Sequence, residues 1–345
     1  MNRINGVSRI LKIVMVCLIV LIGESAMGQG ASLSPYDLMD SYLEKRASYE
    51  SSSTKKIADD KQKELDRLVK VLEDNAPNSY EYHLVKYING NYDVSLKRHL
   101  FKAYELKPDE REVEREMFGY YALVGDKIKQ KEFAKLIEPT YSKNTLNYYK
   151  LLASNPKVKT LFLSGEADAY PLLVLQSLGK VRGNIHLVNL DFLVNETYRL
   201  NAQKKIGMSN VQFLGQERMF INTALSALMA DAFISTTVSQ RYIREPADFC
   251  FLTGLHYQYH CPNQLEELTK FWKDGQQNLN GLTLNSRAEK SLYSNFLPPL
   301  LTLYKIKIAN GEKDLALRKD IIVLAKKVSK EEKVEEVLKA YDQIE

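Results

Sequence analysis

The sequence predicts an α/β core, a doubly wound and mostly parallel sheet, flanked by an N-terminal helical-repeat arm and a C-terminal helical segment. Between residues 156 and 262, short apolar runs alternate with helical patterns, which is typical of βαβ units. The segments before and after this region carry apolar residues at helical spacing instead. We therefore expect four parts: a signal peptide (1–28), a helical domain (29–155), a Rossmann-like domain (156–262) and a helical tail (263–345).

The first 28 residues have the pattern of a secretory signal peptide. Arg3, Arg9 and Lys12 precede an apolar run at residues 13–22, and small residues follow as far as Gly28. The run is shorter than the about 20 apolar residues that span a bilayer. The pattern predicts an exported protein, periplasmic or associated with the envelope. Cleavage after Gly28 and retention as an uncleaved membrane anchor are the two alternatives.

The arm contains two similar units that predict helical hairpins. Gly90 and Gly125 each interrupt a helical pattern, and Ala103 and Ala134 recur in the second helix of each unit. This spacing is close to the roughly 34 residues of a tetratricopeptide repeat, and the units resemble that family. An ordinary helical bundle is the alternative, and both arrangements make the segment helical.

In the core, short apolar runs predict strands at residues 158–163, 184–190, 211–214, 232–238 and 255–260. Helices are expected between these strands, at 171–178, at 192–205 and in a segment that ends near residue 229. Pro171 suits the first turn of its helix. The tail is helical from Gln264, and Ser329 with Glu332 predicts a capping box before the last helix.

Polar residues follow the predicted strands at their carboxyl ends, where open α/β sheets bind ligands. These residues predict an acidic, hydroxyl-rich cleft made of Ser164, Gly165, Glu166, Asp168, Asn189, Asp191, Thr236 and Thr237. Gly165 would permit a sharp turn between strand and helix. The structural alternative is that Asp168 caps its helix while Asn189 and Asp191 satisfy a turn.

Charge and motifs argue against several classes of function. The 345 residues include 48 Lys+Arg and 43 Asp+Glu and show no concentrated basic arm, so we expect no nucleic-acid partner. The sequence lacks the glycine-rich dinucleotide and phosphate loops, and we expect no cofactor.

The cysteines and histidines near residue 260 give no metal motif. His256, His260 and Cys261 lie close together, but no second ligand pair with zinc-like spacing follows, so we expect no metal site. Cys250 and Cys261 could form a disulfide in an oxidising compartment or remain two separate thiols.

One resemblance extends over residues 158–262. Its first two elements are LFLSGEADAYPLLVLQ (161–176) and VRGNIHLVNLDFLVNETY (181–198), and Thr-Thr-Val (236–238) and Gly-Leu-His-Tyr (254–257) follow in the same order. The region resembles the soluble portion of a family of bacterial envelope membrane proteins of unknown function, related to protein O-mannosyltransferases. The sequence has no counterpart of that family's multi-helix membrane region. The resemblance therefore implies a binding or accessory role in envelope glycosylation or assembly.

Three functions remain as expectations. The first is an exported, non-enzymatic adaptor or binding protein whose arm contacts an envelope or inner-membrane protein and whose cleft binds a glycan or peptide. Membrane contact would then occur only through the partner or an uncleaved signal anchor. The second is a soluble glycan-modifying hydrolase or transferase that uses Glu166 or Asp168 as general acid or base. The third is a purely structural envelope protein. A raised carboxylate pKa in a closed cleft would favour the enzyme, and two ordinary exposed carboxylates the adaptor.

Overall fold

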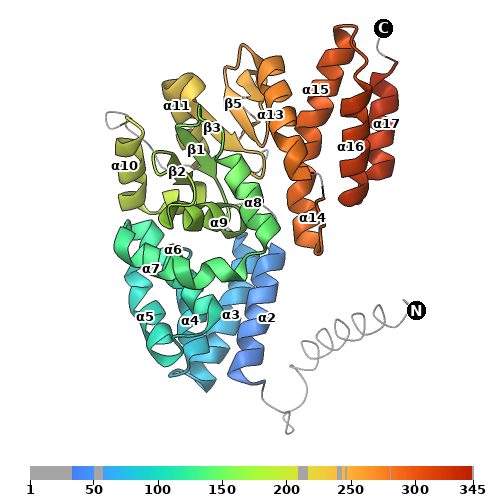
Figure 1. Cartoon of the computed structure of the whole chain (residues 1–345). Coiled ribbons are helices and arrows are strands. Elements are labelled where there is room, and N and C mark those ends of the chain that lie inside the picture. Colours follow the sequence, from blue (N-terminus) through green and yellow to red (C-terminus); the bar gives the residue numbers. More distant parts are fainter. Residues whose placement is uncertain are drawn as a thin grey trace, which may run out of the picture.

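The computed structural model of the chain describes residues 33–49, 57–208, 217–238, 243–244, 247–279 and 281–343. The expected signal peptide and the expected strand at 211–214 lie outside these ranges. Figure 1 shows the arm in blue to teal, the sheet beyond it and the tail in orange to red.

The N-terminal segment is helical, as predicted. Its helices are α2 (Pro35–Tyr49), α3 (Asp59–Asn75), α4 (Tyr80–Asn89), α5 (Lys97–Leu106), α6 (Arg111–Val124), α7 (Lys127–Ile137) and α8 (Lys143–Leu152). Helix α4 packs against α5 and α6 against α7, so both expected hairpins form. Ala103 and Ala134 are fully buried in the second helix of each pair, and Gly125 ends α6 with a φ of 80°.

The core contains a five-stranded sheet in the order β2-β1-β3-β5-β4. Its strands are β1 (Thr160–Leu163), β2 (His186–Asn189), β3 (Ala232–Ser235), β4 (Cys250–Leu252) and β5 (His256–Tyr259). β1 pairs in parallel with β2 and with β3, whereas β5 pairs antiparallel with β3 and with β4. The prediction of a doubly wound, mostly parallel sheet is not confirmed, because the sheet is mixed.

The antiparallel pairing of β4 with β5 follows from a short connection. Only residues 253–255 separate β4 from β5, and a parallel crossover needs a dozen residues or more. The backbone N–H of Thr253 donates to the carbonyl of His256 at 3.0 Å and closes this tight reversal. Gly254, at a φ of 133°, occupies the bend. A hairpin is the only arrangement that this connection allows.

Helices cover both faces of the sheet because side chains alternate along each strand. Leu161 and Leu163 of β1 belong to a cluster with α9 (Glu166–Ser177), while Phe162 belongs to a second cluster with α11 (Glu217–Leu228). The first cluster continues without a break from the arm through α9 into the tail. The arm, the α9 side of the sheet and the tail therefore share one hydrophobic core.

The tail comprises α13 (Gln264–Leu279), α14 (Arg287–Tyr293), α15 (Leu297–Ala309), α16 (Leu315–Lys327) and α17 (Glu331–Tyr341). The capping box predicted at Ser329 is wrong, because α17 begins after Lys330 with no side-chain cap. A capping box occurs instead at Ser286 and Glu289, at the start of α14. Glu289 also accepts a hydrogen bond from Ser142 at 2.6 Å, which ties α14 to the start of α8.

Candidate functional site

Gly165 makes the sharp turn that the sequence predicts. Its φ of 80° favours glycine, and it is the N-cap of α9 directly after β1. Its backbone N–H donates to Asp191 Oδ2 at 2.8 Å, so the carboxylate after β2 satisfies the N-terminus of α9. The loops that follow β1 and β2 are therefore joined at their predicted positions.

Helix α9 begins earlier than expected, and Pro171 lies inside it rather than in its first turn. A proline at this position removes the N–H that would donate to the carbonyl of Ala167. The hydroxyl of Tyr149, from α8 of the arm, donates to that carbonyl at 3.0 Å instead. The arm thus supplies the hydrogen bond that the proline cannot make.

Asp168 lies buried where β1 and β3 end, with 5% of its surface exposed. It accepts hydrogen bonds from the Ser164 backbone N–H at 3.2 Å, the Tyr149 hydroxyl at 3.2 Å and the Ser235 hydroxyl at 3.4 Å. Burial raises the pKa of Asp168 to about 6, although hydrogen bonds from Thr237 and these three residues act in the opposite direction.

Glu166 points toward the arm instead. Its carboxylate lies 3.5 Å from Arg115 Nε of α6, and Tyr92 donates a hydrogen bond to it at 3.4 Å. Arg115 also pairs with Glu112 at 2.6 Å. Glu166 therefore helps to hold the arm against α9, while Asp168 contacts the sheet side of the same helix turn.

The other predicted residues make local contacts. Asn189 Oδ1 accepts the backbone N–H of Asp191 at 3.2 Å, which is the turn role expected in the structural alternative. Thr236 donates to the carbonyl of Leu255 at 3.1 Å, and Thr237 lies within 2.6 Å of the Ser235 hydroxyl. The structure thus brings Ser164 and Thr237 to the carboxylate of Asp168, whereas Glu166 and Thr236 make their contacts elsewhere.

Two buried polar atoms at neighbouring strand ends have no hydrogen-bond partner in the described part of the chain. They are Ser164 Oγ, just after β1, and Asn189 Nδ2, at the end of β2. The register sets Leu163 of β1 beside Asn189, so both atoms lie at the same edge of the sheet. Buried unpaired groups of this kind are where an ordered water or a ligand hydroxyl binds.

Sequence reasoning missed Tyr149, Ser235, Arg115 and Tyr92. Ser235 lies inside the strand predicted at 232–238 and ends the observed strand β3, so its place beside Thr236 and Thr237 was a usable signal. Tyr149, Arg115 and Tyr92 lie far away in the sequence, on the arm, and nothing in the sequence connects them to residues 164–168. The interface between the arm and the core decides where both candidate carboxylates point.

The cysteine and histidine region forms neither a disulfide nor a metal cluster in the structure. Cys250 and Cys261 are both free, because the register sets Tyr259, not Cys261, opposite Cys250. Burial lowers the pKa of His256 to about 4. Across the described ranges, His, Cys, Asp and Glu side chains nowhere gather in a group of three or more that could hold a metal ion.

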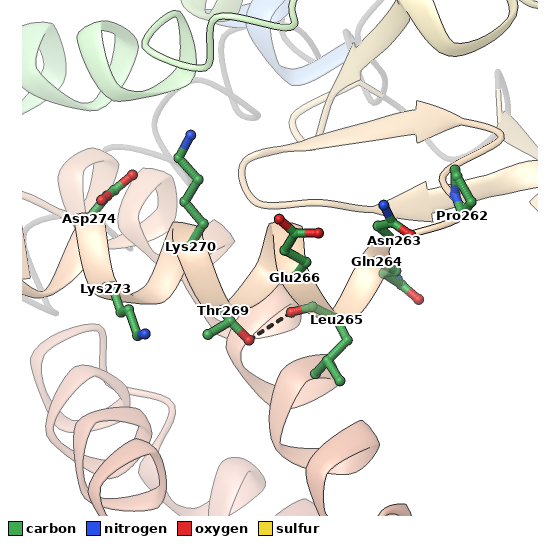
Figure 2. A pocket seen from close by; sticks show the side chains of 9 residues that line it. All are labelled: Pro262, Asn263, Gln264, Leu265, Glu266, Thr269, Lys270, Lys273 and Asp274. Carbon is green, nitrogen blue, oxygen red and sulfur yellow. Dashed lines mark hydrogen bonds between the residues drawn. The ribbon is translucent and has the colours of Figure 1, made fainter.

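Asp168 does not line any of three cavities found in the described part of the chain. One, of about 660 Å³, is an open depression over the first turns of α13, and Figure 2 shows its polar side chains around the helix. A second, of about 370 Å³, lies between the arm, the β4–β5 hairpin and α13. A third, of about 160 Å³, lies between α13 and α16.

Comparisons with protein-family models, with curated proteins and with solved structures find no match to this chain. Among the helices of the described ranges, none combines the length and hydropathy of a membrane-spanning segment.

Proposed function

We propose that this chain is an exported, non-enzymatic adaptor or binding protein of the cell envelope, acting in envelope glycosylation or assembly through contacts of its helical arm. The observation that carries the proposal is that the candidate carboxylates already form ion pairs or hydrogen bonds with other groups of the protein. Glu166 pairs with Arg115 of the arm, Asp168 is enclosed by donors, and Asp191 accepts the N–H of Gly165. A glycosidase of the usual kind needs two carboxyl groups facing one substrate, and here each of the three carboxylates contacts a different group of the protein.

The arm offers exposed apolar side chains for a protein partner. Ile128, in the first turn of α7, is 76% exposed, and Val124 at the end of α6 is 41% exposed. The two residues flank the turn at Gly125. Apolar side chains grouped on a surface are typical of sites that bind another protein.

The experiment is a cross-linking pull-down from envelope preparations with the tagged chain and two variants. Ile128→Glu changes the arm, and Leu315→Glu makes the same kind of change on α16, where Leu315 is 67% exposed. We expect one stoichiometric envelope protein that is lost with Ile128→Glu and retained with Leu315→Glu. Recovery of the chain alone, or equal loss with both folded variants, would contradict the proposal.

The enzyme remains the second candidate because one observation favours it. Asp168 combines burial with a pKa raised to about 6, as a general acid or base does. The Asp168→Asn variant distinguishes the two functions. If a glycan-processing activity is found, Asp168→Asn must abolish it, whereas the adaptor retains its partner with this change.

A further inference from the structure

The cavity of about 370 Å³ lies apart from the residues at the strand ends. Leu152 of the arm, Leu255 of the hairpin, and Phe271 and Phe296 of the tail contribute apolar walls. Phe271 and Phe296 stack, with their ring centroids 5.5 Å apart. A cavity of this size, mainly apolar with a few polar groups, has the character of a small-molecule site.

Two buried polar side chains line this cavity. Thr253 is 2% exposed and His256 is 3% exposed, and Thr253 Oγ1 lies 2.9 Å from His256 Nδ1. Burial lowers the pKa of His256 to about 4, so its imidazole is neutral near pH 7. These two side chains are therefore polar groups of the cavity wall that carry no charge near pH 7.

The ionic side chains that line the cavity are balanced. Glu267, which lines the cavity, pairs with Lys157. Lys270 and Asp274 lie one helical turn apart on α13, and Figure 2 shows both pointing to the same side of that helix. Because each acidic group has a basic neighbour, the cavity does not favour an ionised ligand of either sign.

Gly275 leaves part of the cavity wall without a side chain. It lies inside α13, where glycine weakens a helix, and a Cβ there would meet nothing closer than Phe296 Cε1, at 4.0 Å. Gly254 differs, since a Cβ at that position would lie 2.9 Å from Phe271. Packing explains Gly254 but leaves Gly275 unexplained, and the side chain missing at Gly275 keeps the cavity open.

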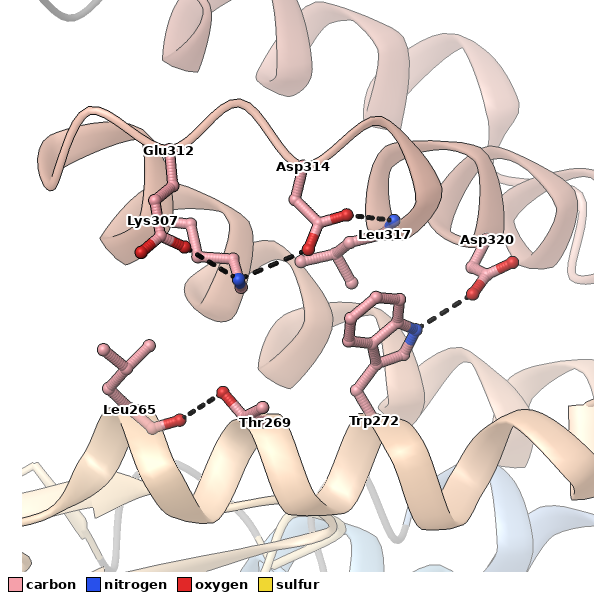
Figure 3. Close-up of polar contacts among 8 residues, drawn as sticks. All are labelled: Leu265, Thr269, Trp272, Lys307, Glu312, Asp314, Leu317 and Asp320. Carbon is pink, nitrogen blue, oxygen red and sulfur yellow. Dashed lines mark hydrogen bonds and ion pairs between the residues drawn. The ribbon is translucent and has the colours of Figure 1, made fainter.

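The face of α13 that points away from the cavity is hydrogen-bonded to α16, another helix of the tail. These contacts keep α13 in place as a wall of the cavity. Trp272 Nε1 donates to Asp320 Oδ2 of α16 at 2.9 Å, as Figure 3 shows. Gln276 donates to the same oxygen at 2.8 Å. A helix held from behind can present a preformed cavity on its other face.

We propose that this cavity binds an uncharged organic molecule with a compact apolar body and a hydroxyl or amide group that hydrogen-bonds to Thr253 and His256. The inference does not depend on the proposed adaptor function.

The test is a ligand-observed NMR titration of the full chain with benzyl alcohol, and with benzylammonium and benzoate as charged counterparts. We expect benzyl alcohol to bind with a Kd on the order of 1 mM, as suits so small a probe. The two ions should bind at least about tenfold more weakly, because they must lose hydration in a cavity that offers no net charge. Absence of saturable binding, or equal binding of the ions, overturns the proposal.

Two variants locate the binding. Gly275→Leu should fill the cavity and abolish binding, while Gly183→Leu is the control, because a Cβ at Gly183 meets nothing within 4 Å. Binding that persists in folded Gly275→Leu protein overturns the assignment. If that variant does not fold, Thr253→Val supplies the test. It should weaken benzyl alcohol about tenfold and leave toluene unchanged, and equal affinity for benzyl alcohol overturns the hydrogen-bonding role.

Discussion

The carboxylate of Asp168 accepts hydrogen bonds from the loop after β1, from β3 and from helix α8 of the arm. Its position after β1 and its proximity to Ser164 follow from the sequence pattern, as does the left-handed turn at Gly165. The hydroxyls of Tyr149 and Ser235 that surround its carboxylate depend on how α8 packs against the sheet. The local sequence pattern predicts which polar residues follow a strand. Tertiary packing determines which of them form hydrogen bonds with one another.

The raised pKa of Asp168 predicts a dependence of stability on pH. The folded chain binds a proton near pH 6, whereas an unfolded aspartate binds it near its ordinary 3.8. Stability from this group therefore rises as pH falls from about 6 to about 4, by up to about 3 kcal/mol. Urea unfolding at several pH values should show this gain for the wild type relative to Asp168→Asn. The exposed control Asp109→Asn should follow the wild type, and parallel curves for wild type and Asp168→Asn would disprove the effect.

His83 and His99 predict the opposite dependence. Their Nδ1 atoms lie 2.9 Å apart where α4 meets α5, and burial lowers the pKa of both rings. The unfolded chain protonates them near their ordinary pKa of 6.5, before the folded chain does. Stability from this pair is thus lost as pH falls below about 6.5. His99→Gln should make the loss between pH 7 and pH 5 shallower in chemical denaturation, and an unchanged slope would contradict this account.

At the scale of elements, the packing of the Tyr170 side chain of α9 against α6 depends on Gly119. A Cβ at this position would lie 2.1 Å from the hydroxyl oxygen of Tyr170. Gly119→Ala should therefore destabilise the protein by about 1–3 kcal/mol through overpacking. Tyr170→Phe removes that oxygen, which has no hydrogen-bond partner among the described residues, and should partly rescue the alanine variant.

Denaturant titration of the single and double variants measures this coupling. Gly183→Ala is the matched control, since its Cβ would enter open space. Additive effects of Gly119→Ala and Tyr170→Phe would mean that the two side chains do not compete for the same volume.

The elements also show where sequence reasoning fails. Apolar periodicity located β1, β2, β3 and β5, but β4 has only three residues and gave no periodic signal. The short connection at Gly254, which the sequence already contained, makes β5 antiparallel to β4. Pro171 was expected to start a helix, because nothing local reveals that Tyr149 satisfies the carbonyl it leaves without a donor. Local sequence patterns do not predict elements that are stabilised by contacts with residues distant in the sequence.

For the whole molecule, the continuous core predicts one cooperative unfolding transition. The cluster that begins at Leu38 in α2 extends through Tyr170 in α9 to Leu338 in α17. Trp272 is the single tryptophan of the chain and reports on the tail, whereas far-ultraviolet circular dichroism reports mainly on the helices as a whole. Both signals should change at the same denaturant concentration. Tryptophan fluorescence that changes first would show that the tail unfolds separately.

The edges of the sheet limit how this molecule can associate. In the sheet that the structure describes, β2 and β4 are the outer strands, with four and three residues. Strands this short expose few unpaired backbone N–H and C=O groups. They therefore offer little opportunity for β-augmentation, in which a strand of another chain extends a sheet through backbone hydrogen bonds. Recognition must then rely on side chains carried by helices. Selection can alter such contacts one residue at a time without disturbing the pairing of the strands.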